Sequence, residues 1–161
     1  MKKILVLFLA LTLIFAFAAC GSAGNENTET NEAYSFAFDG KALVPGAKFD
    51  PKEYKDASSI YQVPSCAIEG TDNVYNYGSF EVTAFDDGKN EVIYSIYIID
   101  ANTSTDEGIY LGDDANTVTE IYGDKFTEND TERTYIKGKT AIVFIIENDF
   151  VASIEYRMIT E

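Results

Sequence analysis

One short motif occurs twice in this chain, and it limits the possible folds more than any other feature. The two copies of Tyr-x-x-Gly-x-x-x-aliphatic consist of Tyr75, Gly78 and Val82, and of Tyr135, Gly138 and Ile142. In each copy the glycine stands first in a two-residue loop between segments rich in apolar residues. Glycine in that place is typical of a β-hairpin with a type II′ turn. The sequence therefore predicts two hairpins of the same design.

Matching blocks on either side of this motif extend it to an internal repeat. Leu43-x-x-Gly46 corresponds to Ile109-x-x-Gly112 ahead of the hairpins, and Ser95-Ile96 corresponds to Ser153-Ile154 after them. Each half is then expected to consist of one helix followed by a three-stranded antiparallel meander, with an extra strand at YSFAF before the first helix and SIYQV as a candidate strand after it. Chance similarity between two strand-rich halves is the alternative explanation.

Two capped segments are the predicted helices. In the first, Asp50 is a good N-cap, Pro51 suits the first helical position and Glu53 can complete a capping box. In the second, Asp113 or Asp114 is the N-cap and Gly123 is the C-terminal stop. Between them Val118, Ile121 and Tyr122 form an apolar face. Both helices are amphipathic, so each is expected to pack its apolar face against a sheet.

These elements predict an α+β fold of two tandem helix-plus-meander repeats, with a mainly antiparallel sheet and short helices packed on one face. Residues 34–161 are expected to form a single domain, with repeats at about 34–100 and 101–161. The segment 141–146 is apolar at every position, so it is expected to be a strand that is covered on both faces. The sequence does not indicate which sheet face the helices cover.

The N-terminus predicts export and lipidation. Lys2 and Lys3 precede an apolar run that ends at Phe17, which is short for a membrane-spanning helix of about 20 residues. The following stretch, FAAC, resembles the lipobox of bacterial lipoproteins. This resemblance implies cleavage between Ala19 and Cys20 and attachment of fatty acyl chains such as palmitate to Cys20. An ordinary secretory signal and a signal anchor are the alternatives.

The resemblance implies a signal peptide at 1–19. It is followed by a lipidated cysteine and a flexible polar tether at 20–33. The expected location is the outer side of the cell membrane, held there by the lipid on Cys20, because two acyl chains are enough for stable anchoring. The tether segment is small and polar, with no apolar period.

The composition excludes several classes of function. The chain of 161 residues carries 27 Asp and Glu against 12 Lys and Arg, a net charge of -15, which disfavours binding to nucleic acid or anionic lipid headgroups. It contains no histidine, which removes the usual general base and the common nucleophile arrangements. We therefore expect no enzyme activity and no cofactor. A carboxylate pair that hydrolyses cell-wall glycan is the enzymatic alternative.

Two further features have a structural and a functional interpretation. The acidic loop from Asp100 to Gly108 spaces its oxygens like an EF-hand loop, but Thr105 and Leu111 replace the required Gly and Glu. A polar loop between the repeats is the favoured interpretation, and no metal site is predicted. Cys66 has no cationic neighbour in the sequence, so we expect a structural thiol.

The phrase GIYLGDDANTVTEIYG is similar to a motif of small envelope proteins in the β-lactamase-inhibitor-protein and BamE-like group. The matching positions are Gly108, Gly112, Val118, Tyr122 and Gly123. The resemblance implies tandem units of helix and antiparallel meander in an envelope protein. The tandem inhibitor proteins carry a disulfide in each repeat and usually two helices, whereas this chain has two cysteines in total and one clear helix per half.

Tyrosine is the remaining signal of function, because it is rigid, amphipathic and enriched at binding interfaces. The predicted binding face consists of Tyr77, Phe85, Tyr97, Tyr135, Val143 and Ile145. We expect a non-enzymatic lipoprotein that presents this sheet face to an unknown envelope protein or peptide. A small-ligand or cation-binding lipoprotein is the main alternative. The identity of the partner and the oligomeric state are not predicted.

Overall fold

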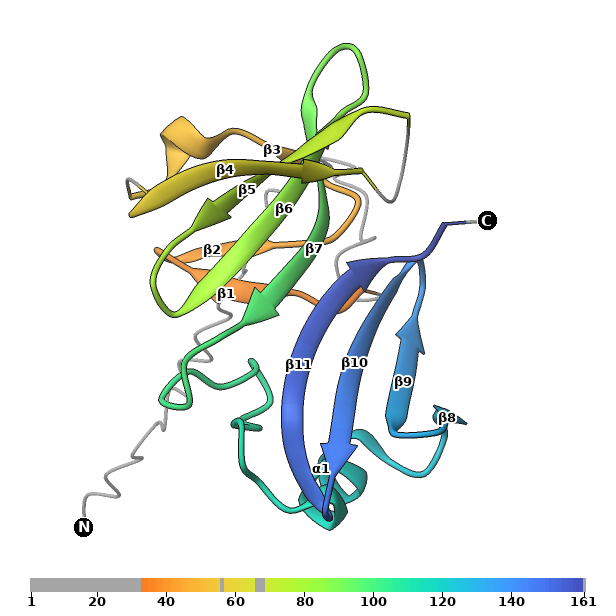
Figure 1. Ribbon diagram of the computed structural model, residues 1–161. Coiled ribbons are helices and arrows are strands. Elements are labelled where there is room, and N and C mark those ends of the chain that lie inside the picture. The colour runs from red at the N-terminus through yellow and green to blue at the C-terminus, as the bar shows by residue number, and fades with distance from the viewer. Residues whose placement is uncertain (1–32, 56, 66–68, 161) are drawn as a thin grey trace, which may run out of the picture.

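The protein consists mainly of antiparallel β-strands (Figure 1). The computed structural model describes residues 33–55, 57–65 and 69–160. The predicted signal peptide, Cys20, the tether up to residue 32 and Cys66 lie outside the described residues. The strands are β1 Phe36–Phe38, β2 Lys41–Leu43, β3 Lys48–Phe49, β4 Ser59–Pro64, β5 Thr71–Asn76, β6 Phe80–Asp86, β7 Glu91–Ile98, β8 Thr127–Asn129, β9 Glu132–Lys137, β10 Thr140–Glu147 and β11 Phe150–Met158.

The large sheet contains two four-stranded meanders, β4 to β7 and β8 to β11. Each meander begins at one edge of the sheet and ends at its centre. The order is β4-β5-β6-β7-β11-β10-β9-β8, with β3 paired to β7, and every pairing is antiparallel. The last strands of the two meanders, β7 and β11, pair with each other between Ser95–Ile98 and Ile154–Arg157. This junction joins the two meanders in one sheet (Figure 1).

The expected α+β class with helices packed on one face is wrong, because the fold is mainly β. A two-stranded hairpin, β1–β2, forms much of the layer over one sheet face. Its turn is made by Asp39 and Gly40, whose φ angles of 52° and 74° reverse the chain directly after Phe38. In the view of Figure 1 this hairpin and α1 Ala115–Tyr122, the one α-helix among the described residues, lie behind the sheet.

The first predicted helix is only a single 3-10 turn, η1 Pro51–Glu53. Asp50 caps it as expected, accepting a hydrogen bond from the Lys52 amide. Glu53 does not complete a capping box, because its carboxylate pairs with the Lys41 ammonium at 2.8 Å. Tyr54 is already extended, with φ of −118° and ψ of 172°. The cap starts a turn, and nothing in the following residues continues the helix.

Both predicted hairpins are present, and their central residues have the same register. Tyr75 pairs with Val82 across the first hairpin, and Tyr135 pairs with Ile142 across the second. The two loop glycines have positive φ angles, 87° at Gly78 and 59° at Gly138, which an L-residue with a side chain rarely adopts.

The final strands, β7 and β11, also share an irregularity. Each has a β-bulge next to its Ser-Ile dipeptide, beside Ser95 in β7 and beside Ser153 in β11. A bulge bends a strand and increases its twist. The two strands that form the junction are therefore bent at corresponding sequence positions.

The core lies on the sheet face that the β1–β2 hairpin and α1 cover. One row of cross-strand partners runs through it from β4 to β9, and its residues are Ile60, Tyr75, Val82, Ile96, Tyr156, Ile142 and Tyr135. All of these except Ile60 are buried. Phe36 and Leu43 of the hairpin, Phe49 of β3 and Val118 of α1 pack against this row.

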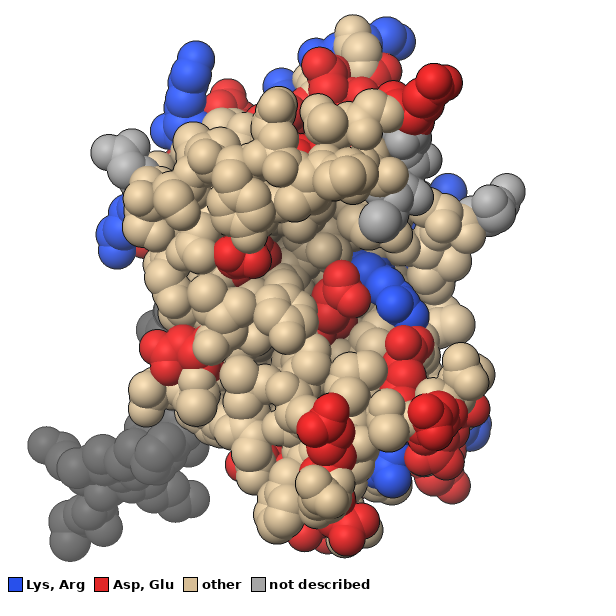
Figure 2. All heavy atoms as spheres, in the orientation of Figure 1, with Lys and Arg blue, Asp and Glu red and all other residues tan. Residues whose placement is uncertain are grey.

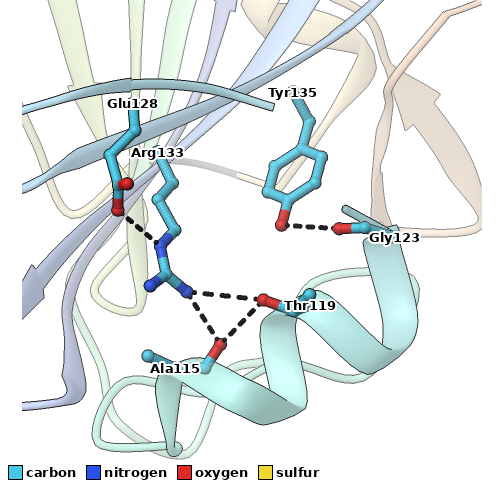
Figure 3. A network of polar contacts seen from close by, with 6 residues as sticks. All are labelled: Ala115, Thr119, Gly123, Glu128, Arg133 and Tyr135. Carbon is cyan, nitrogen blue, oxygen red and sulfur yellow. Dashed lines mark hydrogen bonds and ion pairs between the residues drawn. The ribbon is translucent and has the colours of Figure 1, made fainter. Parts of the chain in front are cut away.

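Helix α1 is held to strand β9 by polar contacts as well as by packing (Figure 3). The Arg133 guanidinium donates to the Ala115 carbonyl at 3.0 Å, and the Tyr135 hydroxyl donates to the Gly123 carbonyl at 3.1 Å. The helix begins at the Asp114 cap and ends at Gly123, as expected. Its buried face contains Ala115 and Val118, while Ile121, which was predicted on that face, is 44% exposed.

Candidate binding face

The sheet face opposite the core is called the open face here, and two rows of cross-strand partners define its centre. Cross-strand partners lie side by side on one face of a sheet. The first row is Asn76, Glu81, Tyr97, Glu155, Val143 and Thr134. The second row is Tyr61, Val74, Thr83, Ser95, Arg157, Ala141 and Ile136.

An ion pair crosses strand β10 on the open face. The Arg157 guanidinium on β11 binds the Glu132 carboxylate on β9 at 2.8 Å, and β10 lies between these two strands. The pair therefore lies over the open-face side of β10, where Ala141 and Val143 are each only 2% exposed. This explains why the segment 141–146 is apolar on both sides. One side faces the core, and on the open face the long side chains of Arg157 and Glu132 cover the other.

The other half of the open face has a similar crossing contact. The Tyr61 hydroxyl on β4 donates to the Glu81 carboxylate on β6 at 2.9 Å, which spans the intervening strand β5. Glu81 also accepts a hydrogen bond from the Asn76 side-chain amide at 2.7 Å. Val74, below this contact on β5, is 4% exposed. In both halves, therefore, a carboxylate on the open face is held by a contact that crosses an intervening strand.

Glu155 is the most perturbed acid on this face. Burial raises the pKa of its carboxyl above the ordinary value, while the Ser95 hydroxyl and the Arg157 guanidinium act in the opposite direction. The Arg157 Nη1 and Glu155 Oε2 atoms are 3.9 Å apart, and Arg157 is bound more closely by Glu132. The carboxylate of Glu155 is therefore incompletely neutralised, and a further cationic group from outside would favour its charged form.

Large apolar side chains are exposed around these polar groups. Tyr61 is 44% exposed, Tyr97 is 39% exposed and Ile136 is 61% exposed. Figure 2 looks onto this side of the molecule and shows a broad uncharged surface with a small group of acidic and basic residues near its centre. Acidic residues also gather towards the two ends of this view. The open face therefore combines exposed aromatic and aliphatic groups with fixed carboxylates.

A depression of about 330 Å³ lies beside the junction of β7 and β11. Its lining includes Tyr94, Ile136, Arg157 and Met158, and it contains no carboxylate. The depression opens onto the surface. It thus differs from the deep pocket of tyrosine and aspartate that the small-ligand alternative requires.

The predicted binding residues divide between the two faces. Phe85, Tyr97, Val143 and Ile145 lie on the open face, although Val143 is buried there. Tyr135 lies on the covered face, 2% exposed and packed against Tyr122, Phe126 and Phe144. Tyr77 also lies on the covered face, where it stacks on Phe80, and burial raises its pKa to about 12. Tyr77 and Tyr135 therefore do not belong to the open face.

Sequence reasoning missed the Glu132, Arg157 and Glu155 group and the exposed Tyr61 and Ile136. The alternation of Ser153, Glu155 and Arg157 along β11 signals a polar strand face, but it does not show what lies across the neighbouring strands. The contact between Arg157 and Glu132 depends on the pairing of β11 with β10 and of β10 with β9.

Side chains of the acidic loop from Asp100 to Gly108 form hydrogen bonds within the protein. The Asp100 carboxylate accepts from the Asn102 amide, and the Asp106 carboxylate accepts from the Ala37 amide at 2.9 Å. Thr105, at the position where an EF-hand has glycine, is buried and accepts from the Ile109 amide. Within the described residues no group of three or more potential metal-binding side chains comes together.

The comparisons with known proteins give no family. No family model, curated protein or solved structure matches this chain. The resemblance to the inhibitor-protein and BamE-like group therefore stays an expectation from sequence. A search of the described part of the chain finds no helix that is long and apolar enough to cross a membrane.

Proposed function

We propose that this protein is a non-enzymatic, lipid-anchored envelope lipoprotein whose open face binds a segment of another envelope protein. The observation that carries the proposal is the exposure of Tyr61, Tyr97 and Ile136 around a fixed group of charged side chains on one sheet face. Aromatic anchors set among polar groups are the usual composition of a protein-binding surface.

The charges of the open face indicate a basic partner. The two central rows contain two carboxylates, Glu81 and Glu155, and one cation, Arg157, which the Glu132 carboxylate already binds. The whole chain has a net charge of -15. Electrostatic complementarity speeds encounter and suppresses wrong partners. The bound segment would therefore carry lysine or arginine, with at least one cation close to Glu155.

The lipid anchor is supported by the FAAC motif and by the polar segment that follows it. A tethered domain would present its open face to proteins at the membrane surface. Neither enzyme activity nor a cofactor is part of this proposal.

The test is capture of envelope proteins by the immobilised, lipid-free chain. The bound protein should be released as salt rises, because exposed charge pairs are screened. Tyr97→Ala should weaken capture by about tenfold, since a central aromatic anchor contributes more than about 1 kcal/mol. Ile121→Ala is the matched control, because Ile121 is 44% exposed on α1, on the opposite side of the sheet. Equal loss in both variants, or capture that does not respond to salt, would contradict the proposal.

A further inference from the structure

Strand β4 forms one edge of the large sheet, and in the described part of the chain no strand pairs with its outer side. All six of its residues, SIYQVP, are uncharged, and all except Val63 are exposed. Ile60 is 62% exposed on the covered side and Tyr61 is 44% exposed on the open face. Natural proteins usually protect an edge with charges, with proline or by making it short. On β4 a proline, Pro64, stands only at the last position. The opposite edge, β8, has three residues and carries Glu128.

The free backbone groups of β4 can be assigned from its pairing with β5. The Ser65 amide donates to the Gly70 carbonyl at 3.0 Å, and the register continues through Val63↔Asp72 and Tyr61↔Val74. In an antiparallel pair, hydrogen-bonded positions alternate. The backbone groups of Ile60, Gln62 and Pro64 therefore point away from the sheet. Because proline has no N–H, the free donors are those of Ile60 and Gln62.

We propose that β4 pairs with β4 of a second copy of this chain, in an antiparallel arrangement about a twofold axis at Tyr61. In this register Ile60 lies opposite the partner's Gln62, so both free N–H donors of each chain are used. Pro64 falls outside the hydrogen-bonded stretch. Tyr61 faces the partner's Tyr61, and aromatic cross-strand pairs are among the favourable ones. The two large sheets become one continuous sheet.

Charge is the reason that the occupant is a second copy. With 27 acidic residues, most surfaces of two copies would bring carboxylates together, whereas β4 brings none. The fixed carboxylate of Glu81 is two strands from the edge, roughly 10 Å at the usual strand spacing. The partner's Glu81 is then more than twice that distance away, beyond the Debye length of about 8 Å in physiological salt.

Self-complementarity gives a second reason. A strand that pairs with its own copy in antiparallel direction makes a closed twofold contact, the commonest symmetry of protein dimers. The chain already joins its two meanders in this way, through the antiparallel pair of β7 and β11. The dimer shares Tyr61 with the open face, but it uses the sheet edge and leaves Tyr97, Glu155 and Ile136 uncovered, so both contacts can form at the same time.

Disulfide trapping of the full chain in cells tests the register. Single cysteines are introduced in a Cys66→Ser background, and the cells are treated with an oxidant. Tyr61→Cys should give a cross-linked dimer, because directly opposed Cβ atoms lie about 5 Å apart. Val63→Cys and Ile136→Cys are the controls, since Val63 would face the partner's Ser59 and Ile136 lies far from the edge. No dimer at position 61, or equal yields at all three positions, would overturn the proposal.

The mass of the purified full chain in detergent gives an independent test. Wild type should sediment as two chains, and Gln62→Pro as one, because proline removes an N–H that the fold itself does not use. Gln62→Ala should remain a dimer, since it keeps that N–H while losing the same side-chain bond to Asn73. A wild-type chain that sediments alone would overturn the proposal. So would a foreign protein that accompanies wild type and is lost from Gln62→Pro.

Discussion

Two tyrosines of the same chain, Tyr97 and Tyr135, show how the sheet gives one residue type two roles. Tyr135 is 2% exposed, and its hydroxyl donates to the Gly123 carbonyl at the end of α1. Tyr97 is 39% exposed and stands between Glu81 and Glu155 on the open face. The first stabilises the fold, and the second is available to a partner.

Removing each hydroxyl separates these roles. Tyr135→Phe should lower the free energy of unfolding by about 0.5–1.5 kcal/mol, because a hydrogen bond is lost within the packed layer. Tyr97→Phe should change it by a few tenths of a kcal/mol at most. Urea titration followed by far-UV circular dichroism measures both. A larger loss for Tyr97→Phe than for Tyr135→Phe would contradict the assignment of the faces.

Glu155 makes stability depend on pH. Burial holds the pKa of this carboxyl above its ordinary value of 4.5, so the folded state binds the proton more tightly than the unfolded chain. The free energy of unfolding therefore falls as pH rises from 4.5 to the raised pKa, and the loss persists above it. Glu155→Gln has no such loss, so its stability relative to wild type should increase from about pH 4 to about pH 7.

Urea titrations at both pH values measure this difference. The control is Glu120→Gln, which changes an exposed carboxylate on α1. A stability difference between Glu155→Gln and wild type that stays constant or shrinks as pH rises would show that Glu155 is not destabilised by burial.

At the scale of elements, turns were predicted better than helices because their signals are local. Gly78 and Gly138 each supply the positive φ that a tight hairpin requires, whatever packs nearby. The cap at Asp50 is equally local, but it only starts a turn. A helix also needs a following apolar face, and the chain after Glu53 becomes extended at Tyr54.

The sequence predicts a strand at β1, but its pairing with β2 in a hairpin was missed although the signal of the turn is present. Asp39-Gly40 lies between FAF and KAL, and Asp-Gly is a strong signal for a type I′ turn. β2 has only three residues, which is too short for alternation to be recognised. As a result the covering layer was assigned to helices.

The cap of α1 is a direct test at this scale. The Asp114 carboxylate accepts from the Asn116 amide at 2.8 Å. Asp114→Ala should lower the free energy of unfolding by about 0.5–2 kcal/mol, and Asp114→Asn should keep most of the stability because asparagine is an equally good N-cap. Thermal unfolding of the two variants beside wild type measures this. Equal stability of Asp114→Ala and wild type would mean that the cap does not stabilise the helix.

At the scale of the whole molecule, one sheet joins the two meanders through β7 and β11. Ile96 and Tyr156 are cross-strand partners at this junction, and neither is exposed. The core row continues from them in both directions to Tyr75 and Tyr135. We therefore expect the described domain to unfold as one unit.

Ile96→Ala tests this unity. The cavity should lower the free energy of unfolding by about 2–5 kcal/mol. Tyrosine fluorescence and far-UV circular dichroism should still give one coincident transition. Separate transitions for the two signals would show that the meanders are independent units.

The candidate site could be predicted only in part, for a reason that belongs to the whole sheet. Alternation along a strand separates two sets of residues, but it does not tell which set is covered. Phe85 and Tyr97 were therefore grouped with Tyr77 and Tyr135, which the β1–β2 hairpin and α1 cover. The crossing contact of Arg157 with Glu132 required the order of β9, β10 and β11, which no local pattern contains.

Site-specific photo-cross-linking in intact cells tests the central claim, binding of a basic partner by the open face, most directly. A photoreactive phenylalanine analogue is placed at Tyr97, and at Ile121 as the control with similar exposure on the opposite layer. The account predicts a discrete adduct with a basic envelope protein from position 97, lost in Glu155→Lys, and none from position 121. No discrete adduct from position 97, or the same adduct from both positions, would contradict it.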